Sequence, residues 1–266
     1  MRIIYNNDEN NEIGENFKHK KTAVALGNFD GLHIAHMNLI RKTKEYKNLT
    51  SCVWTFSEHT LNVLKNDFHL PHITSNDEKI EILRQENIDC LIFQDFNLIH
   101  HLSPEEFIES ILINSLNAQV VVCGFDFRFG HKGAGNVDFL KNRLAQMNIE
   151  TVIIPPIVYN GQVVSSSLVR SLIESGDMPR VHELLGRPFS VKLQMTDSHN
   201  HIFPTGKVVP ACGSYDCTCE IGDITYKSVV NITKDESSNI FMNLIDFENY
   251  PHGCEEIRVN FYEKIK

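Results

Sequence analysis

The chain has 266 residues, of which 42% are hydrophobic and 22% charged, a balance typical of a globular protein with one large or two average domains. Its net charge of −9 argues against a sequence-independent grip on nucleic acid, which needs a basic surface. No run of about 18 apolar residues occurs, so no membrane span is expected.

The N-terminal residues and the cysteines favour a cytoplasmic protein with reduced thiols. Residues 1–12 are polar and lack the apolar core of a signal peptide, and the seven cysteines form no C-x-x-C pair. Cys217 and Cys219 alternate along a predicted strand, so both side chains are expected on one face. A metal or redox role for this pair is the alternative.

The first two thirds of the chain alternate between short apolar runs and amphipathic segments. The predicted strands are residues 22–26, 52–56, 90–93, 120–123 and 151–154. The predicted helices are a segment ending near residue 46, residues 77–85, a segment capped by Ser103, and residues 136–147, 167–175 and 181–185. This alternation predicts a parallel sheet with helices on its faces, and such sheets bind ligands beyond the carboxyl ends of their strands.

The pattern changes after the glycine-arginine-proline sequence at residues 186–188. Four segments beyond it read as β-strands separated by turns, at residues 215–221, 224–230, 241–245 and 256–261. This tail predicts a small antiparallel β-barrel or sandwich. The sequence therefore predicts two domains, residues 1–186 and 187–266.

Residues 27–36 follow the first predicted strand directly and open the first helix. Gly27 lets a ligand approach the backbone, and the helix N-terminus offers free N–H groups to phosphates. His33 and His36 are three residues apart and so share one face of a helix. Two imidazoles there predict hydrogen bonds to phosphate oxygens and stabilisation of a five-coordinate phosphorus. The alternatives are polar surface histidines, a zinc-binding pair and simple turn glycines.

Residues 27–36 resemble the G-x-F-D-x-x-H-x-G-H signature of the nucleotidylyl-transferase superfamily. More narrowly, the chain is similar to the bacterial bifunctional riboflavin kinase/FAD synthetase family. Three later segments carry that resemblance in order: residues 122–135 resemble the flavin-side loop, residues 164–170 the I-S-S-T-x-I-R nucleotide motif, and residues 184–189 the link into the kinase module. The resemblance implies a Rossmann-like parallel-sheet nucleotidylyl-transferase domain followed by a small antiparallel β-barrel.

The resemblance also implies a role for each matching residue. Catalysis at the ATP phosphates is assigned to His33, His36 and Arg170. The ATP-binding residues are Gly27, Asn28, Phe29, Asp30, Ser166 and Ser167. The flavin-binding residues are Phe56, His59, Phe125, Asp126, Phe127 and Arg128. The alternatives are ordinary helix capping for the serines and core packing for the phenylalanines of residues 125–129, since alternate residues of a strand face one way.

The implied reaction joins ATP and FMN to give FAD and pyrophosphate, with Mg²⁺ bridging ATP oxygens and no metal ligand assigned to the protein. The implied partners are small nucleotides and flavins. Transferases acting on pantetheine phosphate or nicotinate mononucleotide share the histidine element, but the flavin-type loop at residues 122–135 argues against both. A non-catalytic flavin or nucleotide sensor is a further alternative, which a retained set of transition-state groups argues against.

The chain departs from the family at several positions. Ala35 replaces a glycine, Ser167 replaces a threonine, and the segment that holds Phe56 lacks two prolines. In the C-terminal module Lys207 stands where the family has a metal-binding asparagine. Phe241 stands in place of a catalytic glutamate when residues 246–247 are aligned with the family. These changes predict a folded barrel without riboflavin kinase activity; retained kinase activity is the alternative.

Overall fold

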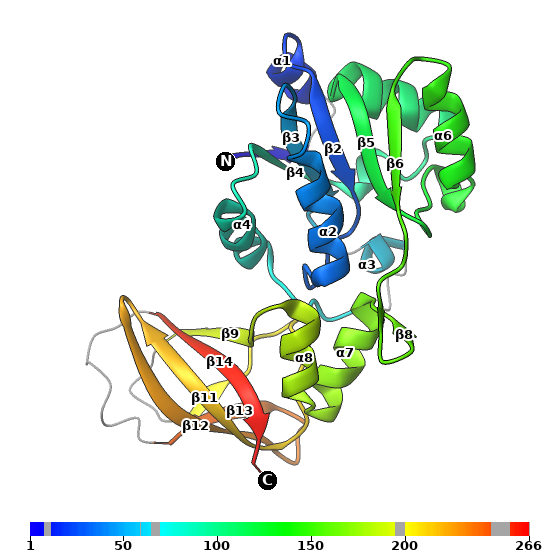
Figure 1. The fold of residues 1–266 in the computed structure, drawn as a ribbon. Helices are drawn as coiled ribbons and strands as arrows, with labels where there is room; N and C mark the ends of the chain where they lie inside the picture. The colour runs from blue at the N-terminus through cyan, green and yellow to red at the C-terminus, as the bar shows by residue number, and fades with distance from the viewer. Residues whose placement is uncertain (8–11, 59, 65–69, 195–199, 246–255, 266) are drawn as a thin grey trace. The chain divides into compact units, whose positions relative to one another are not determined.

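The computed structural model describes residues 1–7, 12–58, 60–64, 70–194, 200–245 and 256–265. The chain divides into two compact units, Met1–Leu70 with Thr74–Val163 and Pro71–Ile73 with Val164–Lys266. Each unit has its own six-stranded sheet (Figure 1). The helices that follow residue 163 are therefore grouped with the second sheet, and the functional boundary between residues 186 and 187 stays a prediction.

The first unit contains a six-stranded sheet in which all neighbouring strands are parallel. Its strands are β1 (Arg2–Asn6), β2 (Thr22–Leu26), β3 (Thr50–Phe56), β4 (Cys90–Gln94), β5 (Ala118–Gly124) and β6 (Glu150–Ile154). Their order is β1-β4-β3-β2-β5-β6, so the winding direction reverses between β2 and β5. The five predicted strands are confirmed. The sequence does not predict the edge strand β1, because it lies in a polar N-terminal stretch.

Helices cover both faces of this sheet (Figure 1). The α-helical and π-helical segments described in the first unit are α1 (Glu12–Phe17), α2 (Ile34–Thr43), α3 (Thr60–Leu64), α4 (Asn76–Gln85), α5 (Pro104–Glu106), the π-helical segment Phe107–Ser115 and α6 (Val137–Ala145). On β2, Ala23 and Ala25 pack with α2 and α4, whereas Val24 and Leu26 pack with α1, the π-helical segment and α6. Because successive side chains of a strand point to opposite faces of the sheet, the first unit has one hydrophobic core on each face.

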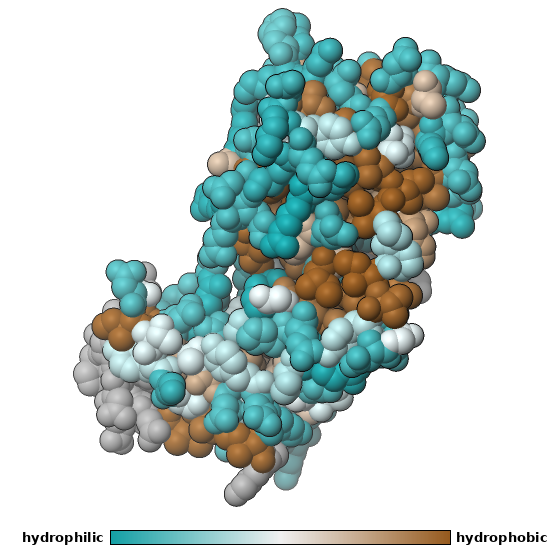
Figure 2. Space-filling view, viewed as in Figure 1, coloured by the Kyte–Doolittle hydropathy of each residue, from teal (hydrophilic) through white to brown (hydrophobic). Residues whose placement is uncertain are grey.

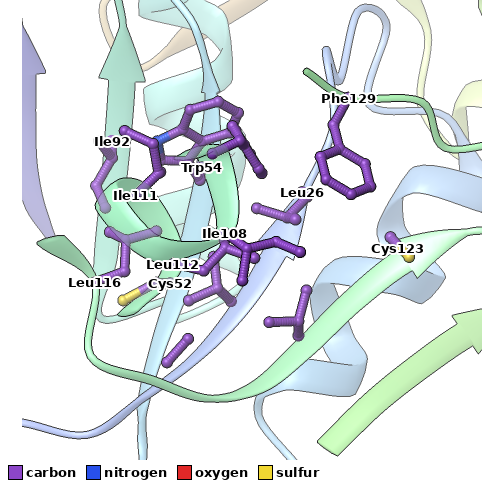
Figure 3. Packing of buried hydrophobic residues seen from close by; sticks show 14 of the residues in the cluster. Leu26, Cys52, Trp54, Ile92, Ile108, Ile111, Leu112, Leu116, Cys123 and Phe129 are labelled. Carbon is purple, nitrogen blue, oxygen red and sulfur yellow. The ribbon is translucent and has the colours of Figure 1, made fainter. Parts of the chain in front are cut away.

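Trp54, the only tryptophan of the chain, lies in the second of these cores (Figure 3). Its side chain is 1% exposed, and its ring meets the rings of Phe56 and Phe107 edge-on at centroid distances of 4.9 and 5.5 Å. Ile92 on β4 and Ile111 in the π-helical segment belong to the same cluster. The fluorescence of Trp54 therefore reports on the folding of the first unit alone.

Side-chain caps begin two helices of the first unit, one of them at the predicted cap Ser103. Ser103 accepts a hydrogen bond from the backbone of Glu106 and the Glu106 carboxylate accepts one from Ser103, which forms a capping box ahead of Pro104. Asn136 likewise caps α6 by accepting from the backbone N–H of Phe139. Among the helices in the described part of the chain, none is long and apolar enough to cross a membrane.

The second unit combines two helices with a nearly closed antiparallel barrel. Its elements are α7 (Ser166–Ser175), α8 (Met178–Leu185), β9 (Phe189–Gln194), β10 (Asn200–Ile202), β11 (Gly213–Ile221), β12 (Ile224–Lys234), β13 (Ile240–Leu244) and β14 (Glu256–Lys264). The strand order is β10-β13-β12-β11-β14-β9 (Figure 1). The predicted antiparallel barrel is confirmed. The thiols of Cys217 and Cys219 on β11 are both buried, in agreement with the prediction that they share one face.

Two short strands, β7 (Val158–Tyr159) and β8 (Gln162–Val163), form a separate hairpin after β6. Its turn contains Gly161, whose φ of +77° places it in the left-handed region. The sequence does not predict this hairpin, because its strands have only two residues each and carry no alternation long enough to recognise.

Candidate functional site

The two loops that carry the main motifs follow adjacent strands of the parallel sheet. Residues 27–33 connect β2 to α2, and residues 125–136 connect β5 to α6. The sheet order reverses between β2 and β5, so both loops leave the carboxyl edge at the topological switch point. Sheets of this type bind their ligands at that point.

The loop after β2 has a strained backbone. Phe29, Gly31 and Leu32 all have positive φ angles, of 48°, 88° and 44°. Non-glycine residues rarely adopt this region, and such strain persists only where surrounding groups fix the conformation. A Cβ atom on Gly27 would lie 2.9 Å from the Phe29 ring, so this position requires glycine.

Buried groups hold this loop from the sheet side. The hydroxyl of Thr55 donates to the carbonyl oxygen of Asn28 (2.9 Å), and the backbone N–H of Thr74 donates to the carboxylate of Asp30 (3.2 Å). Phe29 is 1% exposed and Asp30 is 4% exposed. These two predicted ATP-binding side chains therefore lie within the loop, where they shape its backbone.

His33 and His36 lie against each other at the start of α2. His33 is the N-cap residue, with an extended backbone, and its Nδ1 accepts a hydrogen bond from the backbone N–H of His36 (3.3 Å). The two rings stack at a centroid distance of 3.6 Å with 18° between their planes. Phe29 meets the His36 ring edge-on at 5.3 Å. The two rings therefore meet because His33 caps α2 and His36 lies in its first turn, and only His36 is inside the helix.

The hydrogen bonds and the burial of the two imidazoles determine what each ring can do. Because Nδ1 of His33 accepts a hydrogen bond, the proton of its neutral ring lies on Nε2. The pKa of His36 is held well below its ordinary value of 6.5, first by burial and then by the nearby His33 and Lys79. Within the described part of the chain, Nδ1 of His36 is buried without a hydrogen-bond partner. The His36 ring is therefore suited to hydrogen bonding as a neutral group, and it does not supply a fixed positive charge.

The lowered pKa of His36 predicts that the first unit loses stability in acid. Between the folded pKa and the ordinary value of 6.5, the unfolded chain binds more protons than the folded chain. The free energy of unfolding should therefore fall as the pH drops below about 6.5. Urea unfolding followed by Trp54 fluorescence at about pH 7.5 and about pH 5.5 would measure this loss. In His36→Gln the loss should be smaller; an equal loss in both proteins would contradict the assignment.

Lys79 is a site residue that the sequence reasoning missed. It lies on α4 and is only 7% exposed, and its ammonium group donates to the carbonyl oxygen of Asn28 (3.5 Å). Burial lowers the pKa of Lys79, and the neighbouring Asp30 opposes that shift. The sequence contained one indication that Lys79 is buried. Lys79 precedes Leu83 by four residues and so lies on the same, buried face of the helix.

The loop after β5 differs from the prediction. The predicted strand, residues 120–123, lies within β5, but the alternation of faces assumed for residues 125–129 is absent, because β5 ends at Gly124 and the backbone N–H of Phe127 donates to the carbonyl of Gly124. The correction separates the three phenylalanines. Phe125 is 42% exposed, Phe127 is half-buried, and Phe129 is buried in the core. For Phe129 the core-packing alternative therefore holds.

Exposed apolar surface remains beside this loop. Figure 2 shows hydrophobic side chains gathered near the lower ends of β5 and β6. The exposed hydrophobic residues of the first unit include Phe125 and Val158. The two polar residues of this loop that the sequence assigned to the flavin, Asp126 and Arg128, are both exposed. The Phe127 ring stacks on the Phe129 ring at 5.7 Å, which links the exposed part of the loop to the core.

The far end of the same loop is fixed to the segment before α5. The backbone N–H of His131 donates to the carbonyl of Leu102 (2.6 Å), and Nδ1 of its ring lies 3.2 Å from the carbonyl of His100. Gly130 has a φ of +72°, and a Cβ atom there would lie 2.8 Å from the backbone nitrogen of Pro104. Only glycine fits this close approach.

The other predicted flavin-binding positions lie at and after the end of β3. Phe56 is half-buried, with Trp54 and Phe96 edge-on at 4.9 and 5.3 Å. His59 lies outside the described residues. Phe56 is thus held by aromatic neighbours, and its contact with a flavin stays a prediction.

The second predicted phosphate motif belongs to the second unit. Ser165 is the N-cap of α7 and accepts from the backbone N–H of Leu168, so the capping alternative applies to Ser165. Ser166 and Ser167 form the first turn of the helix. Arg170 is 8% exposed, and its Nε donates to the carbonyl of Pro71 (3.2 Å). The prediction that this group joins the histidine pair at one triphosphate stays a prediction.

Comparisons with known proteins agree with these features. A sequence model described as FAD synthetase matches residues 15–168, which is more than half of the chain. A bifunctional riboflavin kinase/FMN adenylyltransferase from Bacillus subtilis is 31% identical over 270 residues, covering 92% of this chain and 84% of that protein. An FAD synthetase from Listeria monocytogenes is 28% identical over 231 residues, covering 83% of this chain and 90% of that protein.

Among solved structures, a macrolide-efflux protein from Streptococcus pneumoniae matches with a TM-score of 0.84 and 24% identity, covering all of this chain and 91% of that one. At this identity the likeness concerns the fold alone. The family assignment depends on the matched sequence model and on the relative from Bacillus subtilis. This chain belongs to the FAD synthetase family and is a nucleotidyltransferase.

Proposed function

We propose that this protein transfers AMP from ATP to FMN, giving FAD and pyrophosphate. The observation that carries the proposal is the stacked pair His33 and His36 at the start of α2, at the switch point of the sheet. Membership of the FAD synthetase family supports the same reaction. The aromatic loop after the adjacent strand β5 supports a flat apolar acceptor.

The proposed chemistry is an in-line displacement at the α-phosphorus of ATP. An oxygen of the FMN phosphate forms the new P–O bond, and the bond to pyrophosphate breaks. The FMN phosphate is already ionised at neutral pH, so no strong general base is required. Catalysis then consists mainly of alignment and stabilisation of charge on the phosphoryl oxygens.

The protein groups have distinct parts in this proposal. The Nε2–H of His33, the ring of His36 and the free N–H groups of α2 bind phosphate oxygens. Ser166, Ser167 and Arg170 bind them from α7. The isoalloxazine ring of the flavin is proposed to contact Phe56, Phe125 and Phe127. His59, Asp126 and Arg128 are the other residues proposed to bind the flavin.

We propose that Mg²⁺ enters together with ATP as part of the substrate. Mg²⁺ commonly keeps several waters and binds through substrate phosphates with one or two carboxylates. In the described part of the chain no three His, Cys, Asp or Glu side chains are grouped as a metal site. The ATP oxygens would then supply the main ligands.

The C-terminal module, residues 187–266, is proposed to be a barrel without riboflavin kinase activity. Lys207, at the position of the family's metal-binding asparagine, is 6% exposed with its ammonium group 5.4 Å from the centre of the Phe189 ring. A buried ammonium repels a metal ion at the same place. Phe241, at the position of the family's glutamate, cannot accept a proton. Residues 246–247, which anchor that alignment, lie outside the described residues.

A single assay tests both parts of the proposal. With ATP, Mg²⁺ and FMN, chromatography of the flavins should show FAD. With ATP, Mg²⁺ and riboflavin, it should show no FMN above background. The bifunctional relative from Bacillus subtilis serves as the positive control for kinase activity. Robust FMN production would contradict the loss of the kinase, and absence of FAD from FMN would contradict the adenylyl transfer.

The remaining proposals concern the setting of the reaction. We propose that the nucleotidylyl-transferase module spans residues 1–186 and that the protein acts in the cytoplasm on small nucleotides and flavins. The free thiols of Cys52, Cys90 and Cys123 are in keeping with a reducing compartment.

A further inference from the structure

We propose that Lys79 is a positioning residue for adenylyl transfer. In this proposal, its ammonium group holds the strained loop of residues 27–32 in place and supplies fixed positive charge beside the histidine pair. The inference rests on the proposed function, since it assigns a further residue to that site. It is independent of the recognised motifs, because Lys79 lies on α4, outside all of them.

The first argument is the support of the loop. Asn28 lies between the end of β2 and the first residue with positive φ, Phe29. Its carbonyl oxygen accepts hydrogen bonds from Thr55 (2.9 Å) and from Lys79 (3.5 Å). A backbone held in a sparsely populated conformation needs such fixed partners. Lys79 therefore helps to fix the residues that lead directly into the histidine pair.

The second argument is the burial of a charged side chain. Lysines are seldom as buried as Lys79, because moving an ammonium group out of water is unfavourable unless it has partners. Here the partners are the carbonyl of Asn28 and the carboxylate charge of Asp30. A lysine used only for packing would be replaced by an apolar residue without loss, so its burial in this place points to a use of its charge.

The third argument is electrostatic. The charged or titratable groups that act on His36 are His33 from the helix cap and Lys79 from α4, and Asp30 acts in turn on Lys79. Glu78, the neighbour of Lys79, is engaged in the capping box of α4 with Ser75. The Lys79 charge adds to the larger effect of burial in lowering the pKa of His36, so one cation both favours the neutral imidazole and remains available to attract phosphate oxygens.

The experiment compares Lys79→Gln, which removes the charge, with Lys79→Arg, which keeps it. Lys141→Gln on the exposed side of α6 is the matched control. We expect Lys79→Gln to lower kcat for FAD formation by about 10- to 100-fold. Lys79→Arg should recover part of the loss, and Lys141→Gln should behave as wild type. Trp54 fluorescence on heating checks that the first unit stays folded.

Two further measurements separate an electrostatic from a merely structural role. Without the Lys79 charge His36 is easier to protonate, so the acid limb of the pH profile of kcat/KM should move to higher pH in Lys79→Gln. The His36 ring signals in an NMR titration should move in the same direction, and this measurement does not depend on activity. Lys79→Arg should show the wild-type limb and titration.

The outcomes distinguish this inference from the proposed function. If wild-type protein makes no FAD, the proposed function fails, and the NMR titration alone still tests the influence of Lys79 on His36. If wild-type protein makes FAD while Lys79→Gln keeps its kcat, pH limb and His36 titration, the inference is overturned. Should Lys79→Gln fail to fold, Lys79→Met, which suits a buried position, provides the same readouts, and wild-type values in it also overturn the inference.

Discussion

Replacing His36 by alanine is expected to lower kcat for FAD formation by about 100- to 1,000-fold, the usual effect of removing one group that stabilises charge in a transition state. The ring is half-buried, stacked on His33 and edge-on to Phe29, so its position relative to the start of α2 is fixed. The KM for ATP should change less than kcat, because a preorganised group acts mainly in the transition state. Initial rates of FAD formation, measured by chromatography, give both constants.

The controls for this prediction use other histidine variants. His19 is exposed in the same unit, so His19→Ala should keep the wild-type rate. His36→Gln retains a hydrogen-bond donor and should be less impaired than His36→Ala. His33→Ala is a less specific test, because it also removes the acceptor that caps α2. An unchanged rate in a folded His36→Ala protein, with native Trp54 fluorescence, would refute the role given to His36.

Replacing Gly130 by alanine is expected to disrupt the loop after β5 and with it the use of FMN. The new Cβ atom would lie 2.8 Å from the backbone nitrogen of Pro104, and the backbone at φ +72° disfavours any side chain. Strain and overpacking together should destabilise the first unit by about 2–4 kcal/mol. The KM for FMN should rise by about tenfold or more, equal to about 1.4 kcal/mol of lost binding. Initial rates at varied FMN and urea unfolding followed by Trp54 measure the two effects.

Two other glycines provide matched controls for that variant. Gly133 lies in the same loop with φ +66°, but a Cβ atom there would be 3.5 Å from its nearest neighbour, the Cβ atom of Arg128. Gly161 in the β7–β8 hairpin has φ +77°, and a Cβ atom there would meet nothing within 4 Å. Both Ala variants should show only the backbone strain, about 1 kcal/mol. If Gly130→Ala resembles them in stability and in KM for FMN, the close approach of Gly130 to Pro104 has no role in FMN binding.

In these predictions, different chemical groups of the site supply the hydrogen bonds and the positive charge. The lowered pKa of His36 favours its neutral ring, which directs hydrogen bonds, and Nδ1 of His33 is occupied as the acceptor that caps α2. The positive charge near them comes from Lys79 and from the partial charge at the start of α2. Neutral donors beside a fixed cation can stabilise developing charge without a proton transfer of their own.

The sequence by itself determined the elements whose signals are local. Strand β2 was predicted at its observed bounds, and Ser103 caps a helix as expected. Such signals depend on a few neighbouring residues and on hydrogen bonds between residues three apart, so they can be read without knowledge of the fold. The sequence also placed the histidine motif directly after a strand, which is where it lies.

Only the tertiary structure decided which distant segments meet. The order of strands sets β5 beside β2 and so brings the aromatic loop and the histidine loop to one edge of the sheet. It also places Lys79, far from both loops in sequence, against Asn28, and it leaves Phe125 exposed while Phe129 is buried in the core. Pairing of strands and burial of a charged side chain depend on contacts between residues many positions apart. For that reason, neither the period of an apolar pattern nor the spacing of a motif reveals them.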